Sequence, residues 1–278
     1  ISGGLINDTY ALGDHHVLQR LHPIFAASVN DDIARLTEIL RARGVKVPAL
    51  CRTSGGNTSV TVEGDEKTAG TWRILTRLSG HTLHRLADPA QARSAGTIVG
   101  RFHGALSDVQ HDFAFTRPGA HDTNKHMAKV VSALDQHTDH RLAADVRPLA
   151  DELLTRWQRW EGPTNLPTRI GHGDLKASNL LFDDNAAACA VLDLDTMAHL
   201  ELDVELGDAL RSWCNRAAED SAEADFDVAI FEGAVSGYVA SNRGALTAAE
   251  LGAIVPGLTR ICLELSARFA ADALEERY

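Results

Sequence analysis

The chain has 278 residues, which is long enough to bury a sizeable core in one large domain or two smaller ones. Its hydrophobic fraction of 44% and charged fraction of 23% are ordinary for a folded globular protein and argue against intrinsic disorder. The formal net charge of −11 provides no basic footprint for neutralising phosphates, so nucleic acid is not expected as a partner.

Cysteine usage and hydropathy bear on the compartment. The four cysteines form no CxxC pair and lie among apolar neighbours, which is typical of reduced, buried thiols in a cytoplasmic protein. No apolar run approaches the roughly eighteen residues of a membrane span, so no membrane partner is expected. The sequence carries no signal for an oligomeric state.

The N-terminal residues begin with strand patterns and then a helix pattern. Residues 9–21 hold two β-rich runs separated by Gly13-Asp14, a two-residue turn that is typical of a hairpin. A helix is expected next, with Asn30 as its N-cap, apolar residues on one face, and an end at Gly44.

Residues 59–63 and 71–78 predict two further strands, and an earlier strand is expected to end just before Gly3. After Ser79-Gly80 the pattern changes to apolar residues three and four apart, which indicates long helices. These helices are expected at residues 90–106, 124–134, 148–160, 204–217, 225–241 and 248–276. We therefore predict an α+β, bilobal fold with a small strand-rich lobe over residues 1–80 and a larger, mainly helical lobe over 81–278.

One stretch interrupts the helices with strands and carries many acids. Residues 179–195 parse as strand, turn and strand, with Asp183, Asp184 and Asn185 in the turn. This hairpin brings Asn179, at the start of one strand, next to Asp193, at the end of the other. Asp174 precedes Asn179 by five residues, so three oxygen-bearing side chains can converge.

This pattern is suited to phosphate chemistry. Mg²⁺ prefers oxygen ligands and keeps waters and phosphate oxygens in its coordination shell. Two ligands from the protein, the amide of Asn179 and the carboxylate of Asp193, are therefore sufficient. Asp174 can then orient an attacking hydroxyl. Asp195 could share the metal or merely order the site. The spacing H-x-D-x-K-x-x-N, with an aspartate fourteen residues later, is the phosphoryl-transfer layout of protein-kinase-like folds.

At these residues the sequence resembles the aminoglycoside phosphotransferase and choline kinase superfamily, and within it the hexosamine kinase branch. The resemblance rests on the motifs "GGLINDTYAL", "VLQRL", "HDTNK", "HGDLKASNLLFDD", "VLDLDTM", "LGDALR" with "AAED", and "LELSARF", which span nearly the whole chain. It implies a protein-kinase-like fold, with ATP and Mg²⁺ as cofactors. It also implies a small-molecule acceptor, which we expect to be the anomeric hydroxyl of an N-acetylhexosamine or related hexose. An aminoglycoside or an amino alcohol such as choline or homoserine is the alternative acceptor, and a nucleotide-binding protein without transfer activity is a further alternative.

The resemblance also assigns roles to residues. It makes Asp174 the catalytic base or the acid that orients the acceptor hydroxyl, and Asn179 and Asp193 the magnesium ligands. It makes Lys176 the lysine that meets the γ-phosphate, although an ordinary surface lysine would show the same pattern. In the loop of residues 172–176, Gly173 stands where the branch that the sequence resembles has a residue with a side chain. This change is expected to alter the acceptor pocket.

The N-terminal lobe contains the candidates for nucleotide binding. Gly3 and Gly4 allow backbone amides to approach phosphate closely. Gln19 stands where kinases usually carry a lysine, and strand alternation sends Arg20 to the opposite face. The acidic helix partner of that position is Asp32 or Glu38, and adenine is expected near the backbone from Thr76 to Leu78.

For the acceptor, two segments supply candidates. His121-Asp122 opens the "HDTNK" motif, and Arg211, Asn215 and Arg268 lie on predicted helices after the catalytic hairpin. Ordinary helix-surface pairs are the alternative for the arginines, Arg211 with Asp208 and Arg268 with Glu264.

Overall fold

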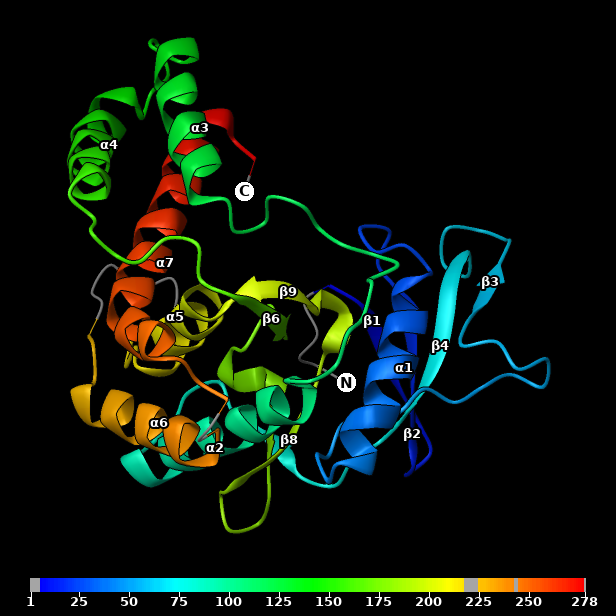
Figure 1. Cartoon of the computed structure of the whole chain (residues 1–278). Helices are drawn as coiled ribbons and strands as arrows, with labels where there is room; N and C mark the ends of the chain where they lie inside the picture. Colours follow the sequence, from blue (N-terminus) through cyan, green and yellow to red (C-terminus); the bar gives the residue numbers. More distant parts are fainter. Residues whose placement is uncertain (1–5, 218–224, 243–244, 278) are drawn as a thin grey trace.

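The computed structural model describes residues 6–217, 225–242 and 245–277. The chain is an α+β protein with a strand-rich N-terminal part and a helical C-terminal part, as the sequence predicts (Figure 1). The strand expected before Gly3 lies outside the described residues. Within the described part, no helix is both long enough and apolar enough to cross a membrane.

The N-terminal sheet is antiparallel and confirms the predicted strands. Its strands are β1 (Asp8–Leu12), β2 (His16–Leu21), β3 (Val60–Val62) and β4 (Gly70–Thr76), in the spatial order β1-β2-β4-β3. The turn between β1 and β2 contains Gly13, whose φ of +61° suits a residue without Cβ. Because β2 and β4 are direct neighbours, their paired side chains share one face of the sheet.

Helix α1 (Val29–Ala42) follows β2 and packs its apolar face into the core. The prediction of Asn30 as its N-cap is wrong, because Ser28 precedes the helix and Asn30 lies within its first turn. It ends close to the predicted Gly44, whose φ is +79°. The Val45 amide donates to the Leu40 carbonyl at 2.9 Å, which closes a Schellman-type C-terminus.

The C-terminal part contains long helices joined by short strands. The helices are α2 (Pro89–Leu106), α3 (Thr123–Gln136), α4 (Ala143–Gln158), α5 (Leu202–Trp213), α6 (Val228–Ser241) and α7 (Ala248–Glu275). The expected start of the third of these helices at Pro148 is wrong, because α4 begins at Ala143 and contains the proline. Pro148 is the sixth residue of α4, so it lies beyond the first turn and removes one intrahelical hydrogen bond, the one to the Ala144 carbonyl.

Short strands complete this part. They are β5 (His81–Thr82), β6 (Thr168–Gly171), β7 (Leu180–Phe182), β8 (Ala188–Val191) and β9 (Ala198–Glu201), with 3₁₀ turns η1 (Ala177–Asn179) and η2 (Leu194–Thr196). β7 and β8 are the predicted hairpin, and β6 pairs with β9. β5 and β9 were not predicted, since strands this short are defined by their tertiary partners more than by their own pattern.

Close helix contacts support the segments that carry the motif. A Cβ on Gly207 of α5 would lie 2.6 Å from the Gly257 carbonyl oxygen of α7, so these helices touch through their backbones. A Cβ on Gly96 of α2 would lie 2.0 Å from the Ala234 carbonyl oxygen of α6. Strands β6 and β9 flank the motif segment 172–195 and lie between the N-terminal part and helices α5 and α7 (Figure 1).

The cysteines follow the prediction in part. All four are free, as expected. Cys214 is buried, Cys51 and Cys189 are half-buried, and Cys262 is exposed, so the expectation that every thiol is buried is wrong.

Candidate active site

A buried carboxylate holds the loop that follows β6. Glu205, on α5, accepts hydrogen bonds from the backbone amides of His172 at 2.6 Å and Gly173 at 2.9 Å, and from His103 Nε2 at 3.0 Å. Burial alone would raise the pKa of Glu205, but the hydrogen bond and charge of His103, together with the backbone amide of His172, lower it to about 2. Glu205 is therefore an ionised anchor for the loop.

Gly173 is required by the backbone of this loop. Its φ is +78°, and a Cβ there would lie 2.4 Å from the carbonyl oxygen of Thr196. The Thr196 hydroxyl donates to the His172 carbonyl at 2.8 Å, so the two segments are in direct contact. Gly173 does line the adjacent cavity, but its conformation and this close approach explain the missing side chain.

Asp174, Lys176 and Asn179 form one hydrogen-bonded group. The Asn179 side-chain amide donates to the Asp174 carboxylate at 2.9 Å and to the Asp174 carbonyl at 2.8 Å. Lys176 Nζ lies 3.0 Å from the same carboxylate oxygen. Because its nitrogen is committed to Asp174, Asn179 has its Oδ1 as the atom that could bind a cation.

Asp193 lies next to this group across the β7–β8 hairpin. The Leu192 amide donates to the Asn179 carbonyl at 2.8 Å, and His172 Nε2 donates to the Leu192 carbonyl at 2.7 Å. Asp193 has a φ of +57°, a left-handed conformation that is uncommon away from glycine and often occurs at functional sites. Its side chain reaches solvent but is crowded by protein atoms, and this desolvation, followed by the charge of Asp195, raises its pKa.

The donor set fits Mg²⁺ in one respect. Within the described residues, no group of three or more His, Cys, Asp or Glu side chains could hold a metal by itself. A cation at Asn179 and Asp193 would therefore complete its shell with water and phosphate oxygens, which is the usual way in which proteins bind Mg²⁺ beside a nucleotide. The raised pKa of Asp193 is the signature of a crowded carboxylate for which a cation would compensate.

Asp195, the open question of the sequence, is paired with an arginine. Arg73 of β4 donates to both carboxylate oxygens, from Nη1 at 2.5 Å and from Nη2 at 2.8 Å. Asn7 Nδ2 donates to the same carboxylate at 2.6 Å. Only 4% of Arg73 and 2% of Asp195 is exposed. This geometry favours an ordering role for Asp195 over that of a third metal ligand.

Gln19 contacts this pair from the neighbouring strand. Its Oε1 accepts from Arg73 Nε at 3.0 Å and Nη2 at 2.8 Å, while its Nε2 donates to the Thr9 hydroxyl at 3.1 Å. Arg20 points to the other face, as alternation predicts, and pairs there with Asp8. The positively charged side chain that contacts Gln19 is therefore Arg73 and not Arg20.

Asp32 is bonded to residues about eighty positions further along the chain. Its carboxylate accepts from His111 Nε2 at 2.8 Å and from the backbone amides of Ala114 at 3.0 Å and Phe115 at 3.1 Å. These residues belong to the connector 107–122, which runs past α1 on its way to α3 (Figure 1). Asp32 thus anchors the connector, a contact that sequence reasoning did not anticipate.

The remaining nucleotide candidates lie at the edges of the N-terminal part. Thr76 ends β4, and its hydroxyl accepts from the Ala49 amide at 2.9 Å. Leu78 is half-buried in the segment that leads to β5. Gly3 and Gly4 lie outside the described residues.

A cavity of about 830 Å³ opens beside Asp174 and Lys176. Its wall combines the connector, the loop of residues 173–176, the end of η2, the start of β9, and helices α5 and α7. The charged or ionisable side chains that line it are Arg117, His121, Asp122, His126, Asp174, Lys176, Asp195, His199, Asp208, Arg211 and Arg268.

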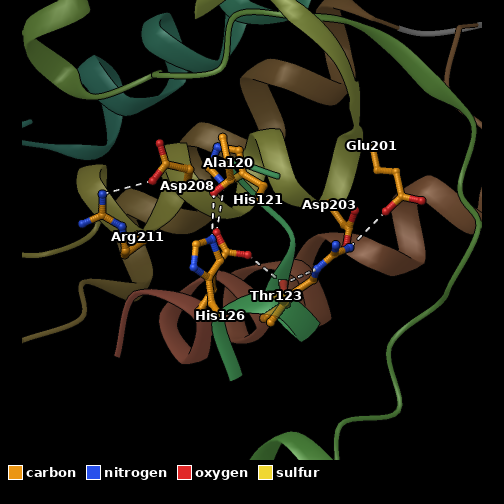
Figure 2. Close-up of polar contacts among 10 residues, drawn as sticks. Ala120, His121, Thr123, His126, Glu201, Asp203, Asp208 and Arg211 are labelled. Carbon is orange, nitrogen blue, oxygen red and sulfur yellow. Dashed lines mark hydrogen bonds and ion pairs between the residues drawn. The ribbon is translucent and has the colours of Figure 1, made fainter. Parts of the chain in front are cut away.

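The His121 wall of the cavity is held by ion pairs (Figure 2). His121 Nδ1 lies 3.1 Å from Glu264 of α7, and the Thr123 hydroxyl donates to the other oxygen of Glu264 at 2.7 Å. Burial works against protonation of His121, but Glu264 outweighs it and raises the pKa of the imidazole. Asp122 caps α3 by accepting from the Lys125 amide, although it also lines the cavity.

The three acceptor-binding candidates that follow the hairpin in the sequence differ in position. Arg211 lines the cavity and pairs with Asp208 at 3.1 Å (Figure 2). Arg268 lines the cavity as an exposed side chain, and its expected partner Glu264 is bonded to other residues. The prediction that Asn215 lies on a helix is wrong, because α5 ends at Trp213 and Asn215 forms a β-bridge with Phe226. Asn215 lines a neighbouring cavity and not this one.

Comparison with known proteins places this arrangement in a family. A sequence model described as the phosphotransferase enzyme family matches residues 1–235. The chain belongs to this family.

Solved structures of similar fold include other phosphotransferases. An amicoumacin kinase in complex with AMP-PNP, Ca²⁺ and amicoumacin is 15% identical, with a TM-score of 0.62, covering 95% of this chain and 80% of that one. An aminoglycoside 2'-phosphotransferase-IIIa in complex with GDP is 14% identical, with a TM-score of 0.65 and coverages of 100% and 84%. A microcompartment-associated aminopropanol kinase is 16% identical, with a TM-score of 0.61 and coverages of 98% and 90%. These likenesses confirm the protein-kinase-like fold.

Sequence reasoning missed several charged residues of this phosphotransferase. Arg73, Glu205 and Arg260 each join segments that are distant in sequence, and Arg260 pairs with both Glu201 and Asp203 at 3.0 Å (Figure 2). Each lies within a strand or helix pattern that gives no local sign of a buried partner. The one available signal was a charge inside an otherwise apolar strand, at Arg73.

Proposed function

We propose that the chain is an ATP- and Mg²⁺-dependent small-molecule kinase that phosphorylates a sugar hydroxyl. The proposed acceptor is the anomeric hydroxyl of an N-acetylhexosamine or related hexose. The observation that carries the proposal is the hydrogen-bonded group of Asp174, Lys176 and Asn179, which borders the 830 Å³ cavity and adjoins Asp193. Family membership supports phosphoryl transfer to a hydroxyl group.

In the proposed reaction, an acceptor hydroxyl in the cavity gives its proton to Asp174 as its oxygen attacks the γ-phosphorus of the nucleotide. A new O–P bond forms, the bond to the β-phosphate oxygen breaks, and the nucleoside diphosphate leaves with the electron pair. Asp174 is suited to this step because Asn179 and Lys176 fix its carboxylate. Lys176 Nζ is near enough to Asp174 to meet the charge on a phosphoryl group transferred there.

The proposed metal site consists of Asn179 Oδ1 and the Asp193 carboxylate, and a bound Mg²⁺ would neutralise phosphate charge. The chain's own contribution is to position these two groups, through the contacts of His172 and Leu192 described above. The nucleotide is proposed to lie between a lobe of residues 1–80, with Gly3, Gly4, Gln19, Thr76 and Leu78, and a lobe of residues 81–278.

The charge of the cavity supports a neutral acceptor. Its lining contains four Lys or Arg side chains, four Asp and three His, so it has no excess of acid for a polycationic aminoglycoside. Two of those acids, Asp195 and Asp208, are already paired with Arg73 and Arg211. A polyhydroxylated sugar needs such paired donors and acceptors more than net charge. His121, Arg211 and Arg268 are the proposed sugar contacts.

An amino-containing acceptor is the second candidate. It is favoured by the solved structures of similar fold, whose names include aminoglycoside and aminopropanol kinases. The protein's net charge of −11 would also attract a cation to its surface, although charge over the whole surface does not define one cavity.

A substrate screen tests the proposal. ATP consumption would be measured over hexoses, hexosamines, their N-acetyl forms, aminoglycosides and amino alcohols, with product analysis at the anomeric carbon. Asp174→Asn should lower the turnover of the accepted substrate by roughly 100-fold or more, since general-base catalysis contributes about that much. The matched control is Asp184→Asn in the exposed hairpin turn, which should behave as wild type. Full activity of Asp174→Asn would refute the mechanism, and preference for an aminoglycoside would refute the sugar.

A further inference from the structure

The buried ion pair between Arg73 and Asp195 joins the N-terminal sheet to residues 192–196, the loop that carries the proposed metal ligand Asp193 and is called the metal loop below. Arg73 lies in β4 and Asp195 in η2, two residues after Asp193. The pair is bidentate and almost fully buried, and it is the kind of planar arginine–carboxylate contact that fixes orientation as well as distance.

The surroundings of the pair come from the rest of the N-terminal part. Gln19 is the direct cross-strand partner of Arg73, so both side chains lie on one face of the sheet. Gln19 Oε1 accepts two hydrogen bonds from the guanidinium, and Asn30 of α1 accepts a third at 3.1 Å. Asn7 links Asp195 to the His22 amide, to which its Oδ1 is bonded at 2.9 Å.

The usual kinase arrangement pairs a strand lysine with a helix glutamate. Here the strand position holds Gln19, the helix contributes the neutral Asn30, and both are bonded to Arg73, whose charge is matched by Asp195. The ion pair has thus moved from within the N-terminal part to a bridge between this part and the metal loop.

We propose that Arg73 and Asp195 are positioning residues for the metal site: the pair holds the Asp193 loop against the N-terminal sheet, and Asp195 is not itself a metal ligand. Neither residue acts on the reacting atoms. The proposal rests on the proposed function, because it concerns how the same site binds Mg²⁺ with a nucleotide.

Two features make the pair suited to this task. Asp193 has a left-handed backbone conformation, which costs free energy and persists only where neighbouring contacts enforce it. The contact of Asp195 with Arg73 lies two residues further on and ties this backbone to a rigid strand. Loss of either partner would leave the other charge buried without compensation and would release the loop.

The test measures Mg²⁺ dependence of nucleotide binding, with no acceptor present. ADP binding to the full chain would be followed by calorimetry, once in EDTA and once over a Mg²⁺ titration, for Arg73→Gln, Asp195→Asn and the double variant. Each single variant should raise the half-saturating Mg²⁺ concentration by about tenfold or more, the factor expected for loss of a charged hydrogen-bonded contact. ADP binding in EDTA should stay as in wild type.

The double variant separates positioning from simple stability. Removing both charges should restore thermal stability towards wild type, since no buried charge remains unpaired, yet the Mg²⁺ requirement should stay as high as in the single variants. Arg20→Gln is the matched control, because Arg20 neighbours Gln19 on the opposite face of the sheet and pairs with an exposed partner. It should change neither quantity. If Arg73→Gln does not fold, Arg73→Lys keeps the charge but loses the planar fork, and should shift the Mg²⁺ requirement in the same direction.

Three results would overturn the inference. Asp195→Asn with a wild-type Mg²⁺ requirement would show that the pair does not position the loop. Additive effects in the double variant would show that the two residues act separately, as expected if Asp195 were a ligand. Equal weakening of ADP binding with and without Mg²⁺ in Arg73→Gln would make Arg73 a direct phosphate contact. Failure of the wild-type chain to bind Mg²⁺ and ADP at all would instead refute the proposed function.

Discussion

Glu205→Gln is the substitution with the best-defined expected effect, because the carboxylate is completely enclosed and all its contacts are known. It accepts from the backbone amides of His172 and Gly173, in the loop that carries the proposed base Asp174 and is called the catalytic loop below, and from His103. A glutamine keeps the shape, but its NH₂ group must face one of these donors. Loss of charge weakens the remaining bonds as well, and hydrogen bonds to charged groups contribute about 1.5–3 kcal/mol each. We expect unfolding free energy to fall by about 3–5 kcal/mol.

The pKa of Glu205 gives a second route to the magnitude. The fall of the pKa from its usual 4.5 to about 2 corresponds to roughly 3 kcal/mol of stabilisation by the ionised form. Since the folded-state pKa is lowered, this contribution is fully present above pH 4.5 and is lost as the pH falls towards about 2. Both routes place the expected loss of unfolding free energy at about 3 kcal/mol or more.

Urea unfolding at pH 7 and at several values between pH 4.5 and pH 2.5 would measure the effect. Wild type should lose stability across this interval, and Glu205→Gln should lose correspondingly less because it lacks the titrating group. Turnover should also fall, since the loop positions Asp174. Glu232→Gln on the exposed face of α6 is the control. A loss below about 1 kcal/mol at pH 7, or an unchanged acid profile in the variant, would contradict the anchor role.

Three further predictions concern neighbouring contacts. Gly173→Ala should reduce turnover and stability together, because the residue has a φ of +78° and no room for a Cβ; wild-type thermal unfolding and kinetics would contradict this. Asp32→Asn should raise the KM for the acceptor more than the Kd for Mg²⁺ and ADP, as it releases the connector that lines the cavity, whereas Asp31→Asn, exposed on the same helix, should raise neither. The ion pair of His121 with Glu264 should stabilise the protein below pH 6.5 and lose its effect as the pH rises through the raised pKa of His121; His121→Gln should abolish that part of the pH dependence of unfolding.

The fold and the motif could be predicted because their signals are local. The β1–β2 hairpin follows from the turn signal of Gly13-Asp14, although the turn has three residues, 13–15, and not the predicted two. The long helices follow from apolar spacing. The hairpin of β7 and β8 places Asn179 beside Asp193 because strand pairing does so in any such hairpin. Asp183 accepts from the Asn185 and Ala187 amides, which confirms the predicted turn.

The contacts of the site with distant segments could not be predicted in the same way. Asp195 and Arg73 are 122 positions apart, and Asp32 reaches Phe115 across 83. Pattern analysis assigns Asp32 to an acidic helix start and Arg73 to a strand, and both assignments are correct for the backbone. The partner of a buried charge depends on which elements the tertiary fold brings together, and a single sequence contains no record of it.

The two anchors make different demands on the site. Glu205 bonds backbone amides of the catalytic loop from within the helical part, and this contact can form without the N-terminal sheet. Arg73 reaches Asp195 from that sheet, so this contact of the Asp193 loop, unlike those of His172 with Leu192 and Thr196, requires the two parts to be together. Motion between them would then leave Asp174 in place and loosen Asp193. Binding of Mg²⁺ should therefore be more sensitive than the catalytic loop to any substitution that separates the sheet from the helices.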